Sequence, residues 1–248
     1  MDISINQIIN NMKKINNNNI TVFYLLLAIL TTVISVNNFT YSAYSQNQDK
    51  SYYILDSAKS YIRWEGKKLT GSHYGHIYFD SSWVELTNGK ISNGEFNLNM
   101  NSIVCHDIED TTMNKQLVKH LKLPDFFDSE QFPQSFLKFK LSIPNPTAKK
   151  GQPNYTIIAD LSIKDSTNTI TFPAVIQLND KGMNATSEFK FDRTNFNIHF
   201  NSIKFFPNIG DKLIYDDITL QINAQFIRKE ELDKILERQA KANKNTSK

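Results

Sequence analysis

The chain has 248 residues, a length that suits one domain, and its 17 Phe and 10 Tyr against only 8 Gly and 7 Pro exclude a collagenous or disordered chain. Its net charge of +3 comes from residues 228–248, which hold seven Lys/Arg and four Asp/Glu, so the neutral body has no basic surface for nucleic acid. The single cysteine, Cys105, excludes an internal disulfide and a CxxC metal or redox pair.

An uncharged apolar segment near the N-terminus predicts export. Residues 20–36, ITVFYLLLAILTTVISV, follow Lys13 and Lys14. The segment is longer than a usual signal-peptide core and only just long enough to span a bilayer, so residues 1–45 are either a cleaved signal peptide or a retained membrane anchor. The two lysines before it place the rest of the chain outside the cytoplasm, in the periplasm or the extracellular space.

From residue 50 onward, apolar residues recur at every second position. GEFNLNMNS, residues 94–102, alternates apolar with polar side chains, and residues 155–163, 170–178 and 218–226 do the same. Turn sequences such as TNGK, NDKG and PNPTAKKGQPN separate such segments. Because the helical crossovers that parallel strands need are missing, the pattern predicts an all-β antiparallel barrel or sandwich.

Three alanines lie on the apolar faces of these predicted strands. Ala159, Ala174 and Ala224 stand among large apolar neighbours. Small inward residues favour a barrel with an unfilled lumen, whereas the same alanines would also fit a packed sandwich core. Alternation alone leaves both interpretations open.

Two helices are expected. Residues 111–122, TTMNKQLVKHLK, follow several acidic residues, carry basic residues at their end and stop before Pro124. Residues 228–242 are charged on most faces, and we expect a helical tail outside the barrel within residues 228–248.

Several motifs resemble one family. HLKLPDFFDSEQFPQSFLKF, residues 120–139, and WEGKKLTGSHYGHI, residues 64–77, are similar to runs of the YceI-like family, a group of exported, lipocalin-like polyisoprenoid-binding proteins. NGEFNLNMNSI, FDRTNFNI and IGDKLIYDDITLQINAQF continue the likeness, which covers roughly residues 52–227 in the expected order. The resemblance implies an antiparallel lipocalin-like β-barrel over residues 46–227, with a short inserted helix and a C-terminal helical extension.

The resemblance also implies what the barrel does. We expect it to bind a long apolar lipid, a polyisoprenoid or an isoprenoid quinone, without catalysis and without another cofactor, as a carrier or store. A homodimer is a further expectation. The residues expected to line the lumen are Phe96, Leu98, Met100, Phe139, Leu141, Ile157, Ala159, Leu161, Phe172, Ala174, Phe189, Leu220 and Ala224.

The double phenylalanine after Pro124 is expected to close one mouth of the barrel. Leu121, Phe126 and Phe127 would form an aromatic plug that excludes water from the lumen. The nearby His120 is interpreted first as a cap or turn residue, and second as a group that touches the head of a ligand.

Two other functions stay open. The chain would be an exported interaction module if its barrel were packed with side chains, or, less favoured, an enzyme acting on an apolar substrate through His73 or His120. His73 and His76 point to opposite faces of a strand, so we expect no metal site from them. Asp192 and Arg193 are expected to form a structural salt bridge.

Overall fold

The computed structural model describes residues 48–246, so the predicted signal peptide or anchor, residues 1–45, lies outside the described residues. The chain divides after Gln48 into two units, and every strand and helix within residues 48–246 belongs to the second, Asp49–Lys248. No helix within residues 48–246 is both long and apolar enough to cross a membrane.

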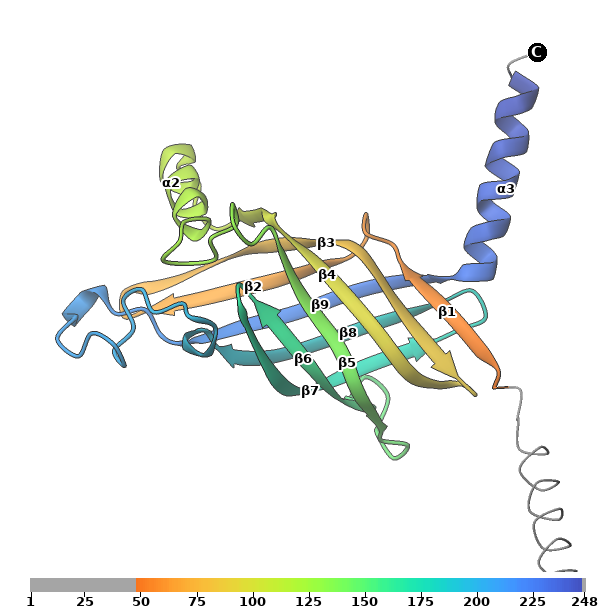
Figure 1. The fold of residues 1–248 in the computed structure, drawn as a ribbon, viewed down its shortest axis with the longest axis horizontal. Coiled ribbons are helices and arrows are strands. Elements are labelled where there is room, and N and C mark those ends of the chain that lie inside the picture. Colours follow the sequence, from red (N-terminus) through yellow and green to blue (C-terminus); the bar gives the residue numbers. More distant parts are fainter. Residues whose placement is uncertain (1–47, 247–248) are drawn as a thin grey trace, which may run out of the picture. The chain divides into compact units, whose positions relative to one another are not determined.

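Nine strands of the described chain form one antiparallel sheet that closes on itself (Figure 1). The order is β1-β3-β2-β9-β8-β7-β6-β5-β4, and pairing of β3 with β4 closes the barrel, as between Phe79 and Leu98. The barrel alternative to a sandwich is therefore confirmed. The strands are β1 (Lys50–Leu55), β2 (Tyr61–Lys68), β3 (Gly71–Thr87), β4 (Lys90–Cys105), β5 (Gln134–Pro144), β6 (Tyr155–Ile163), β7 (Ser166–Leu178), β8 (Gly182–Asp192) and β9 (Asp217–Arg228).

Two short strands share one of the eight positions around the barrel. β1 pairs with β9 through Tyr53 and Arg228, and β2 pairs with β9 through Trp64 and Leu220. Both also pair with β3, one near each of its ends. β1 and β2 therefore act as a single broken strand.

The longest strands bend at bulges. The sequence pattern predicts separate strands at HIYF and WVEL, but both belong to β3, whose pairing with β4 shifts between Phe79 and Ser82. The predicted turn TNGK joins β3 to β4. Asn88 and Gly89 have φ values of 50° and 74°, the left-handed pair that a two-residue hairpin with matching twist requires.

The predicted alternation places one face of each strand inside the barrel. On β6, Ile157, Ala159 and Leu161 are buried, whereas the residues between them are more exposed. The core thus lies within the sheet, built from the apolar faces that period two identifies.

Helix α2 (Thr111–Leu121) lies between β4 and β5 and confirms the predicted inserted helix. Asp110 caps it by accepting a hydrogen bond from the Met113 N–H at 2.8 Å. Helix α3 (Lys229–Thr246) continues from β9 and confirms the predicted C-terminal helix, with an ion pair of 2.8 Å between Lys229 and Asp233 one turn apart.

Between β8 and β9 the chain leaves the barrel in a long loop that begins with the 3-10 turn η1 (Arg193–Phe196) and contains η2 (Gly210–Lys212). The predicted salt bridge between Asp192 and Arg193 is wrong. Asp192 caps the N-terminus of η1, where it accepts hydrogen bonds from Thr194 and pairs with Lys204. The buried Arg193 side chain pairs with Asp216 instead.

Glu85 on β3 ties down β1. The Tyr52 hydroxyl donates to Glu85 Oε2 at 2.7 Å, and Lys50 Nζ lies 3.2 Å from Oε1. The hydrogen bond from Tyr52, together with Lys50 and Ser92, outweighs burial and lowers the pKa of Glu85 from 4.5 to about 2. A carboxyl whose pKa is lowered by folding stabilises the fold above its unfolded pKa, and that contribution is lost as pH falls through the folded pKa.

We therefore expect stability to decline between pH 4.5 and about 2, in part because Glu85 becomes protonated. The free energy of unfolding, measured with urea at several pH values across this window, should decline less steeply with falling pH for Glu85→Gln than for the native chain. Tyr52→Phe removes only the donor and should give an intermediate slope. Equal slopes for all three proteins would contradict this role of Glu85.

Candidate functional site

The barrel interior retains two small apolar cavities. One, the plug cavity, has a volume of ≈110 Å³, and the other, the inner cavity, has a volume of ≈40 Å³. Trp64, Phe127 and Ile218 line both. The two cavities therefore belong to one apolar column that these three side chains interrupt.

The residues predicted to form the plug lie at one end of this column. Leu121, Phe126 and Phe127 all line the plug cavity, and Phe127 reaches the inner cavity as well. The Phe126 ring contacts His120 and Phe200, with centroid distances of 4.9 Å and 5.3 Å. An aromatic cluster thus lies at this end of the barrel.

Backbone hydrogen bonds fix the turn that carries the plug. The Phe127 N–H donates to Leu121 O at 3.1 Å, and the Asp128 N–H donates to Leu123 O at 3.0 Å, with Asp128 in the left-handed region at φ 47°. His120 Nε2 lies 3.0 Å from Asp125 Oδ2. His120 and Asp128 therefore act as cap and turn residues, which agrees with the first interpretation of His120.

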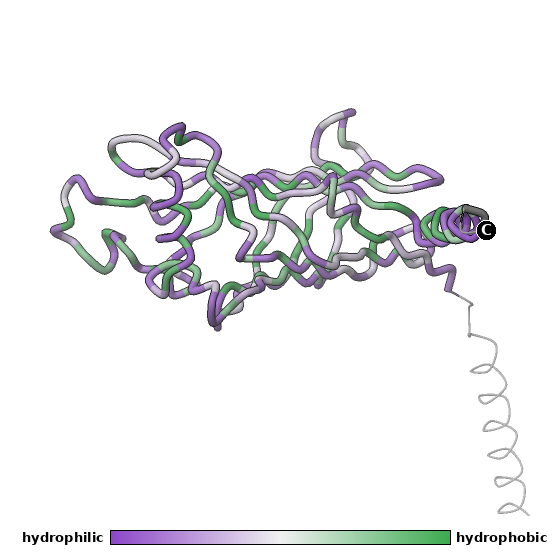
Figure 2. Tube along the Cα trace, turned by 90° about the horizontal axis from the view of Figure 1, so that it is seen from above, coloured by the Kyte–Doolittle hydropathy of each residue, from purple (hydrophilic) through white to green (hydrophobic). Residues whose placement is uncertain are grey.

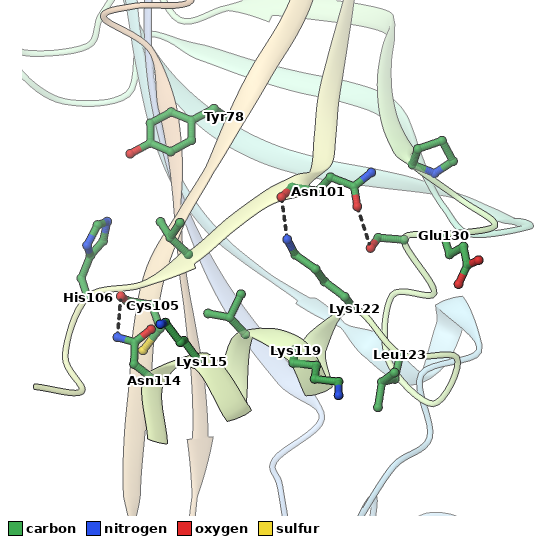
Figure 3. Close-up of a pocket in the computed structure, with 14 residues that line it drawn as sticks. Tyr78, Asn101, Cys105, His106, Asn114, Lys115, Lys119, Lys122, Leu123 and Glu130 are labelled. Carbon is green, nitrogen blue, oxygen red and sulfur yellow. Dashed lines mark hydrogen bonds between the residues drawn. The ribbon is translucent and has the colours of Figure 1, made fainter. Parts of the chain in front are cut away.

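The outer side of α2 is tied to β4. The Asn114 amide donates to Cys105 O at 3.1 Å, and Lys122 Nζ donates to Asn101 O at 2.7 Å (Figure 3). These contacts border an open hollow of ≈1020 Å³ between helix and strand, lined in part by Lys115 and Lys119. The hollow lies outside the barrel, is open to solvent and has three lysines in its lining, so it does not enclose a long apolar chain.

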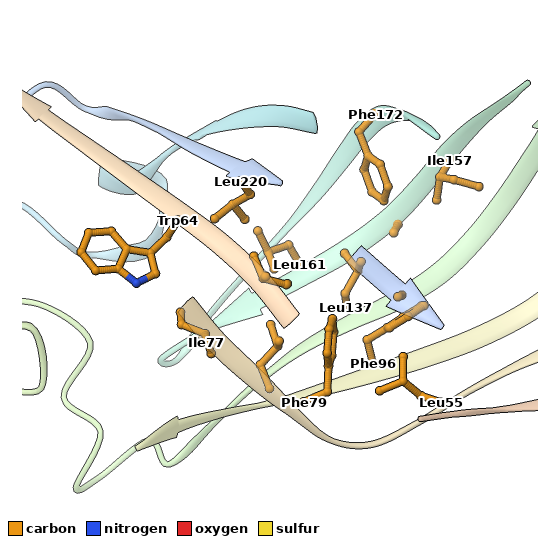
Figure 4. Packing of buried hydrophobic residues seen from close by; sticks show 14 of the residues in the cluster. Leu55, Trp64, Ile77, Phe79, Phe96, Leu137, Ile157, Leu161, Phe172 and Leu220 are labelled. Atoms are coloured by element: carbon orange, nitrogen blue, oxygen red, sulfur yellow. The ribbon is translucent and has the colours of Figure 1, made fainter. Parts of the chain in front are cut away.

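Four of the thirteen residues predicted to line the lumen reach a cavity. Leu98, Met100, Leu161 and Leu220 line the inner cavity. Eight others are buried or half-buried in the core beyond it, where aromatic rings fill the barrel (Figure 4): Phe96, Phe139, Ile157, Ala159, Phe172, Ala174, Phe189 and Ala224.

The aromatic packing explains why the three alanines do not open a lumen. Phe96 lies 5.4 Å from Phe139 and 5.9 Å from Phe226 between ring centroids, and Phe172 stacks on Phe189 at 4.5 Å. All three alanines are buried in this core, with Ala159 0% exposed, and Ala159 pairs across the sheet with Phe139. Their small size therefore complements large neighbours.

Leu141, the thirteenth predicted residue, points out of the barrel and is 52% exposed. A bulge in β5 is the reason, since Phe139 pairs with Ala159 while Leu141 pairs with Ile158, which leaves Lys140 as an extra residue. One extra residue reverses the side-chain alternation. Ser142 takes the inward position next to Ile157 instead.

Polar groups gather at the rim of the plug cavity. Lys67, Lys68 and His73 line it from the hairpin between β2 and β3. His73 Nδ1 lies 2.8 Å from Asp107 Oδ2. Burial alone would raise the pKa of Asp107, but hydrogen bonds from the Tyr74 N–H, from His73 and from the Cys105 thiol hold that pKa below its usual range.

This rim does not form a nucleophilic site. The Cys105 thiol is buried and donates to Asp107 Oδ1 at 3.3 Å, and burial and this carboxylate both raise its pKa. A raised pKa disfavours the reactive thiolate, and Asp107 rather than a histidine lies next to the sulfur.

His76 lies apart from His73 and stacks on Tyr61 with a centroid distance of 4.2 Å, as expected if His73 and His76 point to opposite faces of the strand. Among residues 48–246, no group of three or more His, Cys, Asp or Glu could hold a metal ion.

The YceI-like domain model matches residues 53–226. The chain belongs to the YceI-like family. BcnA of Burkholderia cenocepacia has a similar structure at 18% identity, covering 69% of this chain and 98% of its own, with a TM-score of 0.50. A polyisoprenoid binding domain from Saccharophagus degradans, implicated in plant cell wall breakdown, also has a similar structure. It is 11% identical, and the match covers 71% of this chain and 98% of that domain with a TM-score of 0.50. These identities support the shared fold alone. The curated proteins include no match.

Sequence reasoning did not assign several apolar residues that line the cavities of this YceI-like domain. Alternation in YIRWE could have identified two of them, because Ile62 and Trp64 alternate with charged residues. Ile198 and Ile214 lie outside the strands, where no periodicity marks an inward residue. The other unassigned apolar residues are Ile77, Ile103, Leu117, Ile163, Phe191 and Ile218.

Proposed function

We propose that this YceI-like barrel binds a long apolar lipid, a polyisoprenoid or an isoprenoid quinone, in its interior. Membership in the family and the name of the Saccharophagus degradans domain support a polyisoprenoid ligand. The observation that carries the proposal is the apolar column beneath the plug, whose two cavities meet at Phe127. Binding, rather than catalysis, is the role that such a column supports.

The energetics of the proposal rest on displacing side chains. Burial stabilises an apolar chain by about 0.8 kcal/mol per CH₂. The cavities of ≈110 and ≈40 Å³ are far below the roughly 300–1,000 Å³ of sites that hold whole ligands. A long chain therefore requires Phe127 and its neighbours to move, and the turn that carries Phe127 lies outside the sheet, where it can move without breaking the barrel.

The proposed site of action is outside the cytoplasm, where the protein would carry or store the lipid. Lys13 and Lys14 before the apolar residues 20–36 support this location. The same segment would hold the protein at a membrane if it were retained, and so keep the barrel near its source of lipid.

An exported interaction module is the second candidate, and the small cavities favour it. Native mass spectrometry of the full chain, purified from membranes of the cells that produce it, distinguishes the two. A stoichiometric prenyl-lipid adduct, identified after organic extraction, is expected. A protein that carries no adduct and takes up neither added long-chain ubiquinone nor polyprenol would contradict lipid binding and favour the module.

Filling the plug cavity should weaken loading. Gly66 lines this cavity, and a Cβ added there would lie 3.7 Å from Ile218 Cδ1, an ordinary contact. Gly66→Ile places further carbons in the cavity and suits a strand. Displacing about two methylenes of ligand, at ~0.8 kcal/mol each, should lower prenyl-lipid affinity about tenfold.

The matched control for this variant is Gly66→Ala, which adds one methyl group and leaves most of the cavity open. It should bind prenyl lipid like the native chain, as measured by the adduct fraction in the same experiment. The urea midpoint of unfolding of both variants should be equal to or higher than that of the native protein. Native-like occupancy in Gly66→Ile would show that the ligand does not use this cavity.

A further inference from the structure

Two neighbouring loops expose large apolar side chains at the plug end of the barrel. One is the hairpin between β2 and β3, and the other is the loop between η1 and β9 (Figure 1). We name the exposed apolar residues of these loops the tip surface, and each is between 45% and 53% exposed: Leu69, Ile203, Phe205, Phe206 and Tyr215. A contiguous exposed apolar patch commonly marks an interaction site.

Backbone hydrogen bonds join the two loops into one surface. Lys68 forms a β-bridge with Ile214, and the Tyr215 N–H donates to Lys67 O at 2.9 Å. Within the long loop, the Ile214 N–H donates to Asn201 O at 3.0 Å, which closes the segment that carries the phenylalanines. Figure 2 shows apolar stretches at the tip of this loop. The exposed side chains are therefore held in place together.

Basic residues surround the tip surface. Residues 66–72 and 201–217 contain Lys67, Lys68, Lys204 and Lys212 against Asp211, Asp216 and Asp217, and Asp216 is paired with the buried Arg193. Lys204 pairs with Asp192, and Lys67 lies 3.2 Å from Glu65. All four lysines are exposed. Apolar side chains that insert between lipids, flanked by lysines that meet anionic head groups, are the two features of an interfacial membrane-binding site.

We propose that the tip surface docks this barrel on an anionic lipid bilayer. A second copy of the chain fits the surface less well, because a two-fold contact through it would bring the lysines of one copy against those of the other. A bilayer rich in acidic lipid offers the opposite charge and an apolar interior at once.

Docking would set the plug cavity against the membrane. The cavity is lined by Lys67 and Lys68 from one loop and by Ile198 and Ile214 from the other. Phe200, at the base of the long loop, packs against the plug residue Phe126 with a centroid distance of 5.3 Å. Insertion of the tip therefore acts on the element that covers the cavity. This inference goes beyond lipid binding, since a barrel could dock without a ligand or bind a ligand without docking.

The test places a fluorescent reporter at the tip of the full chain. Phe206→Trp substitutes an exposed ring with no ring partner among the described residues, and Phe205→Trp tests the ring stacked on His199. With vesicles rich in phosphatidylglycerol, the added tryptophan should shift its emission to shorter wavelength and be quenched by brominated acyl chains. Leu178→Trp, at the end of β7, is the matched control for an exposed apolar site away from the tip, and it should show neither change.

The reporter separates tip docking from attachment through residues 20–36, because quenching by brominated acyl chains requires residue 206 itself to enter the bilayer. Lys204→Gln with Lys212→Gln, two tip lysines that do not line the plug cavity, should reduce quenching of the tip reporter at low protein concentration, by about thirtyfold in apparent vesicle affinity. Quenching by neutral and anionic vesicles alike, absence of quenching, or a blue shift that depends on protein concentration without lipid would each overturn the proposal. Prenyl-lipid adducts measured on the same variants report lipid binding independently, so either proposal can fail alone.

Discussion

Replacing Gly75 with alanine is expected to destabilise the barrel by about 3–5 kcal/mol, at the upper end of single substitutions. A Cβ on Gly75 would lie 1.7 Å from Val104 O and 2.9 Å from Cys105 Cα, so the backbone of β4 would have to move. Val104 O also accepts a hydrogen bond from Trp64 Nε1 at 3.2 Å. The substitution would therefore disturb the closing pair of strands and a side chain that lines both cavities.

The control for this substitution lies on the neighbouring strand. Gly66→Ala makes the same chemical change, but its Cβ would meet only Ile218 Cδ1, at 3.7 Å. We expect it to be neutral or to stabilise by up to about 1 kcal/mol, because alanine has fewer conformations in the unfolded chain. Urea midpoints for the two variants measure the difference. Similar midpoints would show that β3 and β4 separate at Gly75 at little energetic cost.

Much of the fold was predictable because each of its determinants is local. Period two in segments such as 155–163 fixes which side chains face inward, and Asn88–Gly89 fixes the direction of a hairpin. Closure of the barrel is different, since it depends on pairing between strands. The alternation was compatible with a sandwich, and it was the family resemblance that favoured the barrel that the structure confirms.

The candidate site was predictable only in part. Phe126 and Phe127 after a helix and a proline are a conspicuous local pattern, but it was the family resemblance that implied a plug there. Leu141 was misplaced because a bulge at Lys140 leaves no mark in the alternation. The volume of the lumen could not be predicted either, because it depends on how Phe96, Phe139 and Phe172 pack across the barrel.

Arg193→Met is expected to destabilise the long loop and the plug cavity by about 3–5 kcal/mol, the range for breaking a buried ion pair by removing one partner. The Arg193 side chain is 2% exposed and donates to Ile198 O at 2.9 Å, to Ile214 O at 3.0 Å and to Tyr215 O at 3.3 Å. Its guanidinium also lies 3.2 Å from Asp216. Methionine fills similar volume but leaves three carbonyls without their donor and Asp216 without the guanidinium.

Arg193→Lys separates the charge from the geometry of this side chain. Lysine keeps the charge but presents a single ammonium group, which cannot span carbonyls on both arms of the loop as the planar guanidinium does. We therefore expect it to recover only a small part of the lost stability. Arg63→Met is the matched control, because Arg63 is more exposed and lies 3.2 Å from Glu65, a pair worth about 0–1 kcal/mol. Urea unfolding compares the stabilities of Arg193→Met, Arg193→Lys and Arg63→Met. Hydrogen exchange of residues 197–215 distinguishes local unfolding of the loop from a loss of global stability. Equal stability of Arg193→Met and Arg63→Met would mean that the loop keeps its position over the plug through Phe200 and the β-bridge to Lys68, with the buried arginine adding nothing measurable.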